Sequence, residues 1–166
     1  AKAFFELLTE TIEPMQVLEA MLETGLLTAY LPEFSNVESL AQHDLYHIYT
    51  VDRHQLQAVN ELAKLKQSEE ELFRGLKSPY LLYLAALLHD IGKGRNMDHS
   101  ELGAEMVTTL AGRLGLDKKE QEGLAFLIRY HLFLPENAMR RDLEDLEFIR
   151  QSAGLIGDIA VSYTHL

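Results

Sequence analysis

The sequence has no cysteine among its 166 residues, which excludes disulfide bonds, a thiol nucleophile and thiolate zinc sites. It is also poor in positive charge, because 15 Lys and Arg residues face 26 Asp and Glu residues and give a net charge of −11. That charge repels phosphate backbones and anionic lipids, so nucleic acid and membrane surfaces are poor partners unless a metal neutralises phosphate locally. The longest wholly apolar run, from Tyr80 to Leu88, is far shorter than the ~20 residues of a membrane-spanning helix.

Apolar residues make up 47% of the chain and charged residues 25%, which is enough apolar surface for one domain with a single core. Almost every segment has the apolar periodicity of a helix, and none alternates convincingly as a strand does. In the longest predicted helix the apolar stripe comprises Val51, Ala58, Leu62 and Leu65. The pattern predicts a compact all-α bundle. Between its helices we expect a connector at 31–34, a charged exposed stretch at 69–77 and a loop around Pro135. The predicted helices cover residues 14–24, 50–66, 80–89, 100–114, 118–131 and 146–153.

Four histidines and one aspartate stand out by their positions on these helices. His54 shares the apolar stripe of its helix, His131 continues the apolar face of another, His89 and Asp90 end the most apolar helix, and His99 begins the next one. A single inward histidine is usually a hydrogen-bonded core residue, but several imidazoles buried without partners would cost too much. Neutral imidazole with carboxylate is a common ligand set for divalent metals. Spacing alone leaves both interpretations open.

Further polar residues have weaker signals. Lys93 follows Asp90 in a turn, where it could contact a bound phosphate or simply be a solvated lysine. Arg140 and Arg141 are candidates for phosphate binding or for charge pairing at a helix end, and an ordinary surface position is the simpler interpretation. His47 lies seven residues before His54, on the same helical face, and is a candidate for supporting the site or capping the helix.

Several longer motifs, taken in their order along the chain, resemble those of a known family. His54 followed by His89-Asp90 resembles the H…HD signature of the HD superfamily of metal-dependent phosphohydrolases. Four phrases occur in sequence: HIYTVDRH at 47–54, HDIGKGR at 89–95, DHSELGA at 98–104 and RRDLED at 140–145. Together they resemble the HD domain of the bifunctional uridylyltransferase/uridylyl-removing enzymes of bacterial nitrogen regulation. The resemblance covers about residues 14–160.

This resemblance implies a cytoplasmic enzyme that hydrolyses the phosphodiester joining UMP to a tyrosine of the PII signal protein. It implies a divalent metal cofactor, Mn²⁺ or Mg²⁺ with Fe²⁺ as an alternative. Carried over by motif, His54, His89 and Asp90 would hold one ion, and His99 and His131 would hold or assist a second, with Asp90 bridging. Asp90 and Lys93 would be the catalytic residues, and the residues that support the ligands or bind phosphate would be His47, Asp98, Arg140 and Arg141.

The resemblance also sets expectations about domain organisation. Residues 1–40 are expected to be a helical linker and residues 41–160 an HD domain truncated at its C-terminus, while the family's nucleotidyltransferase and ACT domains are absent from the sequence. HD sites usually close with a later aspartate in a Thr-x-x-Asp phrase, and Asp158 falls too early for it. The last residues, 161–166, resemble a translated sequencing adapter and are expected to be a non-native tail, so His165 is not counted as a ligand.

Two alternatives to the uridylyl-removing activity remain from the sequence. One is a generic HD-type nucleotidase or a cyclic-dinucleotide phosphodiesterase, although the Gly-Tyr-Pro phrase of the latter is missing after His131. The other is a non-catalytic helical sensor or interaction module. Such modules usually lose metal ligands, whereas all five candidate ligands are present here.

Overall fold

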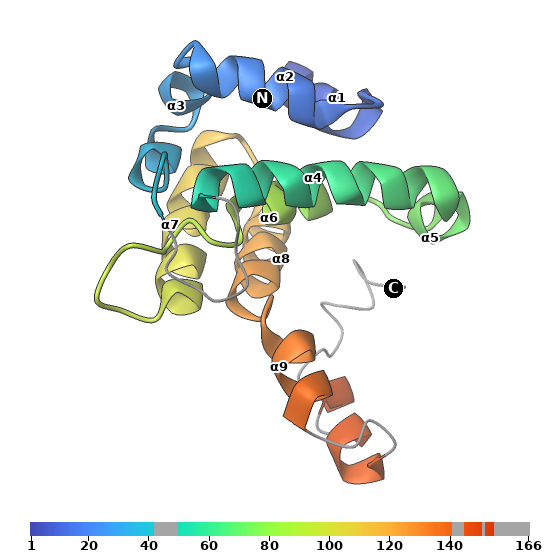
Figure 1. Cartoon of the computed structure of the whole chain (residues 1–166). Coiled ribbons are helices and arrows are strands. Elements are labelled where there is room, and N and C mark those ends of the chain that lie inside the picture. Colours follow the sequence, from blue (N-terminus) through green and yellow to red (C-terminus); the bar gives the residue numbers. More distant parts are fainter. Residues whose placement is uncertain (42–49, 141–144, 151, 155–166) are drawn as a thin grey trace.

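The computed structural model describes residues 1–41, 50–140, 145–150 and 152–154, and within these ranges it contains helices and no strand. The prediction of an all-α fold is therefore confirmed. In chain order the helices are α1 (Lys2–Glu10), α2 (Pro14–Glu23), α3 (Leu26–Tyr30), the 3₁₀ helix η1 (Pro32–Asn36), α4 (Val51–Ser68), α5 (Glu70–Arg74), α6 (Tyr80–Leu88), α7 (His99–Arg113), α8 (Lys118–Arg129) and α9 (Phe133–Arg140). Figure 1 shows α1 and α2 above α4, with α6 behind α4, and α7 and α8 crossing behind α4 and extending below it.

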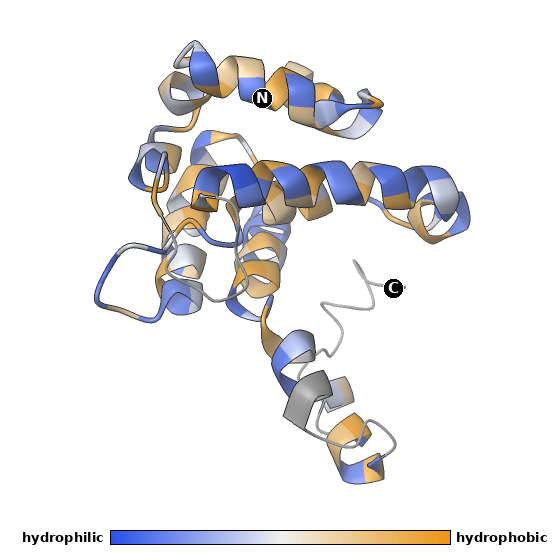
Figure 2. Ribbon diagram, in the orientation of Figure 1, coloured by the Kyte–Doolittle hydropathy of each residue, from blue (hydrophilic) through white to orange (hydrophobic). Residues whose placement is uncertain are grey.

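Helix α6 forms the centre of the bundle and packs against α1, α4 and α8. It is apolar on every side, as a helix surrounded by other helices must be. Five of its nine residues are buried, namely Leu81, Tyr83, Leu84, Leu87 and Leu88. Burying each such side chain contributes roughly 1.5–3 kcal/mol, so α6 anchors the residues that follow it. In Figure 2 the more exposed α4 alternates between hydrophilic and hydrophobic residues along its length.

Helices α7 and α8 form a hairpin beside α6. Gly115 makes the turn between them with φ of 80°, a left-handed conformation that favours glycine. Asp117 then caps α8 in a reciprocal capping box with Glu120. Glu120 also accepts hydrogen bonds from Ser78 and Tyr80, which ties the start of α8 to the start of α6. The hairpin is thus fixed against the central helix at the end opposite to His89.

The N-terminal helices share the same core as the rest of the bundle. Buried side chains from α1 and α2 pack in one cluster with those of α4, α6 and α8. Two ion pairs fasten this layer: Arg53 to Glu19 at 2.6 Å, and the guanidinium of Arg113 to both carboxylate oxygens of Glu33 at 2.7 Å each. The division of the chain into a linker and a domain at residue 40 stays a prediction.

Three local expectations were wrong. The stretch at 69–77 contains the short helix α5, which buries Phe73, so it is not wholly exposed. Pro135 lies in the first turn of α9 and not in a loop, because an N–H is not needed there. The buried face of α4 is centred on Gln55, Leu56 and Val59, while Leu65 is exposed. No helix in the described part of the chain is long and apolar enough to cross a membrane.

Candidate metal centre

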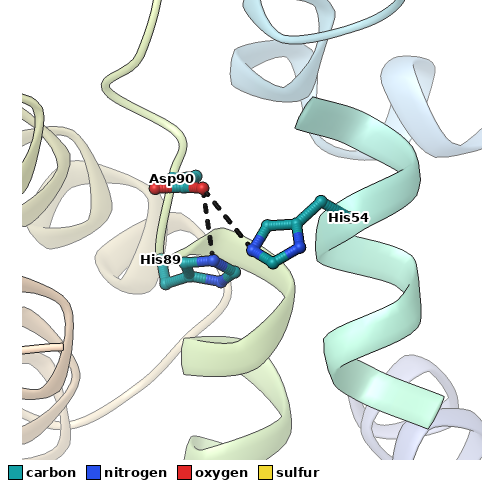
Figure 3. A group of neighbouring side chains, drawn as sticks. All are labelled: His54, His89 and Asp90. Atoms are coloured by element: carbon teal, nitrogen blue, oxygen red, sulfur yellow. Dashed lines mark ion pairs between the residues drawn. The ribbon is translucent and has the colours of Figure 1, made fainter. Parts of the chain in front are cut away.

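Five polar side chains meet where the ends of four helices converge. His54 is in the first turn of α4, His89 and Asp90 directly follow α6, His99 is the first residue of α7, and His131 lies just beyond α8. Figure 3 shows His54 and His89 approaching Asp90 from two different helices. The imidazole rings form a chain in which neighbouring centroids are 5.0 to 5.4 Å apart. Residues separated by up to 77 positions therefore line one small site.

Asp90 lies at the centre of this group and is only 2% exposed. Its Oδ2 atom faces Nε2 of His89 at 3.3 Å and Nε2 of His54 at 3.9 Å. Its other oxygen, Oδ1, faces Nε2 of His99 at 3.5 Å and Nε2 of His131 at 3.6 Å. Each carboxylate oxygen thus has its own pair of imidazoles, and the carboxylate is shared by two groups of three ligands.

Hydrogen bonds to the backbone orient two of the rings. His89 Nδ1 is 2.9 Å from the carbonyl oxygen of Ala86, and His131 Nδ1 is 2.7 Å from that of Ile128. A carbonyl can only accept, so Nδ1 is the donor in both rings, and a ring that carries only this proton has a lone pair on Nε2. That lone pair is directed toward the Asp90 carboxylate, which is also an acceptor. Either a metal ion between the two or a proton on Nε2 satisfies both.

Two buried nitrogen atoms support the interpretation as a metal site. Nε2 of His99 and Nε2 of His131 are both inaccessible to solvent, and neither has a hydrogen-bond partner among the described residues. Leaving such an atom unsatisfied costs roughly 1–3 kcal/mol. The ligand atoms of each group lie within 4.8 Å of one another. One group is His54, His89 and Asp90, and the other is Asp90, His99 and His131. Bonds of about 2.0–2.2 Å to a divalent ion require ligand separations of this size, so the residues fit a metal.

The charge states suit the same chemistry. Burial raises the pKa of the Asp90 carboxyl, but the facing His131, His89 and Lys93 groups outweigh burial and hold the pKa far below its usual range. Burial lowers the pKa of His99, and this effect exceeds the opposing influence of Asp90. The site therefore combines an anionic carboxylate with a neutral imidazole. Imidazole and carboxylate without thiolate is a donor set for Mn²⁺, Fe²⁺ or Mg²⁺.

The turn after Asp90 brings Lys93 back to the carboxylate. The backbone N–H of Lys93 donates to the Asp90 carbonyl at 2.9 Å, and its ammonium nitrogen lies 2.8 Å from Asp90 Oδ2. The Lys93 side chain is 18% exposed, so this ammonium group lies between the buried carboxylate and solvent. A substrate entering the site would meet this positive charge.

Five further residues were considered from the sequence as support for the metal ligands, as phosphate contacts or as a possible closing ligand: His47, Asp98, Arg140, Arg141 and Asp158. Asp98 does not contact the carboxylate of Asp90; it caps α7 by accepting from the backbone N–H groups of Ser100 and Glu101. It thereby fixes the first turn of the helix that carries His99. His47, Arg141, Asp158 and the tail at 161–166 lie outside the described residues, as does the side chain of Arg140, the last residue of α9.

Sequence reasoning missed two residues that support the site. Asp52 is buried and accepts from the backbone N–H of Ser39 at 2.9 Å, which holds the chain before α4 against the start of that helix. Gly92 is packed so closely against α7 that no side chain fits there. In the sequence, Asp52 is marked only as an acidic residue in the first turn of a helix, within the phrase HIYTVDRH. Gly92 is marked only by its place inside the phrase HDIGKGR.

Replacing Gly92 with Ala is expected to destabilise the protein by about 1–3 kcal/mol, the usual cost of overpacking, and to weaken Mn²⁺ binding. The new Cβ would lie 2.3 Å from the His99 carbonyl oxygen and 2.8 Å from the Gly103 nitrogen. Both are backbone atoms, so the turn must move and separate Asp90 from His99. Urea unfolding and calorimetric Mn²⁺ titration measure both effects. Gly75→Ala is the control, because nothing lies within 4 Å of a Cβ there; equal behaviour of the two variants would contradict the expectation.

Comparison with known families identifies the class of protein. The sequence profile described as "HD domain" matches residues 51–152, more than half of the chain, and begins at the first residue of α4. The chain belongs to the HD domain family. The matched range contains His54, His89, Asp90, His99 and His131.

Curated relatives narrow the comparison further. Proteins named "Bifunctional uridylyltransferase/uridylyl-removing enzyme" are similar to the chain: that of Rhodospirillum rubrum is 38% identical over 94% of the chain, that of Azospirillum brasilense 40% over 93%, and that of Haemophilus influenzae 42% over 90%. The aligned region is only 18% of each of these proteins. The chain thus corresponds to the HD region of much longer enzymes.

Proposed function

We propose that this chain is the uridylyl-removing domain of a larger bifunctional enzyme, and that it hydrolyses the phosphodiester between UMP and a tyrosine of the PII protein. The observation that carries the proposal is the Asp90 carboxylate, whose two oxygens each face a pair of imidazole nitrogens. The names of the similar proteins, which include uridylyl removal, suggest the substrate class. The larger enzyme would be cytoplasmic and would carry nucleotidyltransferase and ACT domains in the same chain.

His54, His89 and Asp90 would hold one divalent ion, and Asp90, His99 and His131 a second. Mn²⁺ or Mg²⁺ is the proposed metal, with Fe²⁺ as an alternative, because the ligands are nitrogen and oxygen atoms only. When bound, such ions lower the pKa of water and offset negative charge on a phosphodiester. Asp90 is the one carboxylate in the set, so it would supply all the negative charge that the protein gives to the ions.

Lys93 would act on the substrate beside the metal ligands. Its ammonium group is held at the carboxylate by the turn through Gly92, so its positive charge is positioned before substrate arrives. A fixed cation of this kind stabilises charge that develops on the phosphate oxygens in the transition state. The leaving tyrosine has a pKa near ~10 and departs more readily than an aliphatic alcohol. A strong general acid is therefore less necessary than for a sugar or serine ester.

The metal requirement gives a direct test. Protein stripped with EDTA is expected to lose hydrolysis of UMP–tyrosine in uridylylated PII, and Mn²⁺ should restore it because the ions supply both the nucleophile and charge compensation. Release of UMP is measured by chromatography, with thymidine 5′-monophosphate p-nitrophenyl ester as a small phosphodiester. Hydrolysis of the ester but not of uridylylated PII would favour a generic HD nucleotidase. Mn²⁺ binding without either hydrolysis would favour a non-catalytic module.

A further inference from the structure

The loop that joins Asp90 to His99 begins and ends at residues of the candidate metal centre, and it is fixed near both ends. At its start, Gly92 is buried against α7, and Gly94 adopts φ of 80° with its α-carbon facing the side chain of Leu40. At its end, Asp98 caps α7. Residues 94–98 are exposed between these fixed points. The loop therefore presents its exposed side chains at the border of the site.

Arg95 is the cation in this exposed segment, and it differs from the other arginines. Five arginines whose side chains are described form ion pairs with carboxylates: Arg53, Arg74, Arg113, Arg129 and Arg150. Among the described residues no carboxylate forms an ion pair with Arg95. This is notable because acidic residues outnumber basic residues 26 to 15 in the sequence, so partners are abundant.

The loop places Arg95 close in the chain to the cation at the candidate metal centre. It is two residues from Lys93, and two residues of chain span at most ~7 Å. The Lys93 ammonium group itself touches Asp90 Oδ2. Arg95 thus lies next to Lys93 along the same turn, with its side chain exposed at the border of the site.

The chemistry of guanidinium suggests which anion Arg95 would bind. The planar group donates two parallel hydrogen bonds to the oxygens of a phosphate, which an ammonium cannot do. We propose that Arg95 binds the phosphate group of the substrate nucleotide and is a substrate-binding residue of the site. This inference rests on the proposed function, since it takes a phosphodiester to be the group that reacts.

The test uses uridine 5′-monophosphate as the probe in calorimetric titrations with Mn²⁺ present. Arg95→Ala is expected to weaken UMP binding about 10-fold or more, because a hydrogen-bonded charged group contributes roughly 1.5–3 kcal/mol. Arg95→Lys should recover part of the loss, since it keeps the charge without the paired donors. Arg74→Ala is the matched control, an exposed arginine on α5 that pairs only with its helical neighbours Glu70 and Glu71.

Further measurements separate this proposal from the proposed function. Mn²⁺ affinity and thermal stability should be the same in Arg95→Ala as in the unmutated protein, and the KM for UMP–tyrosine should rise more than kcat falls. UMP binding within twofold of the unmutated protein would overturn the proposal, as would a loss confined to uridylylated PII with UMP binding intact. An unmutated protein that binds Mn²⁺ but not UMP would overturn the role of Arg95 and leave the metal centre standing. Absence of Mn²⁺ binding would instead overturn the proposed function.

Discussion

Replacing Asp90 with Ala is expected to abolish hydrolysis and to lower Mn²⁺ affinity by more than the ~100-fold that loss of a group supporting a metal ligand can cost. Asp90 belongs to both groups of candidate ligands. It is also the one carboxylate in them, and neutral imidazoles cannot replace its charge. A single substitution therefore removes a ligand from two ions at once. UMP release and calorimetric Mn²⁺ titration measure the two effects.

The fold should survive this change. The Asp90 carboxylate is surrounded by the polar groups of His54, His89, His99, Lys93 and His131 rather than by the apolar core. Asp90→Asn is the matched control, because it keeps the shape of the side chain and removes the charge. Both variants should keep the helical circular dichroism of the unmutated protein and should lack activity. Activity near the unmutated level in either variant would reject the proposed role.

The side chains that the structure brings together at the candidate metal centre could be predicted to face one another, because each has a position that periodicity makes visible. His89 and Asp90 end a helix that is apolar on all sides, and His131 extends the apolar face of α8. Helix ends are also where adjacent residues can face a single site, since in mid-helix they point ~100° apart. What periodicity could not supply is the allocation of one Asp90 oxygen to each pair of histidines. That depends on the packing of α4, α6, α7 and α8.

The wrong prediction for the buried face of α4 has a physical cause, which is that polar residues can be buried. The apolar pattern predicts that the inward face of α4 consists of Val51, Ala58, Leu62 and Leu65. Val51 is buried, but the observed face also includes the polar residues Asp52 and Gln55, and Leu65 is exposed. Asp52 is satisfied by backbone N–H groups of Ser39 and Arg53, contacts that no hydrophobic pattern encodes. His54 consequently lies at the border of the buried face, 33% exposed on its side chain, where it can reach both Asp90 and solvent.

Replacing both His99 and His131 with Ala is expected to reduce Mn²⁺ binding from two ions per chain to one. The two groups of ligands share Asp90 alone, so the pair of His54 and His89 would remain complete. The converse double variant, His54→Ala with His89→Ala, serves as the matched control and should also bind one ion. Hydrolysis should fall about 100-fold or more in both, because two ions that clamp a phosphodiester act together. Stoichiometry is measured by calorimetry and by the electron spin resonance of bound Mn²⁺.

Thermal unfolding distinguishes a lost metal site from a damaged fold in the variant that lacks His99 and His131. The Nε2 atoms of these two residues are buried without a hydrogen-bond partner among the described residues. Removing them therefore removes two unsatisfied polar atoms, and this gain offsets the packing lost by truncation. The metal-free variant should unfold within a few degrees of the metal-free unmutated protein. Its stabilisation by Mn²⁺ should be smaller, since each bound ion adds RT ln(1 + [L]/Kd) to the free energy of unfolding. Two ions bound by this variant, or one by the unmutated protein, would contradict the assignment of one ion to each Asp90 oxygen.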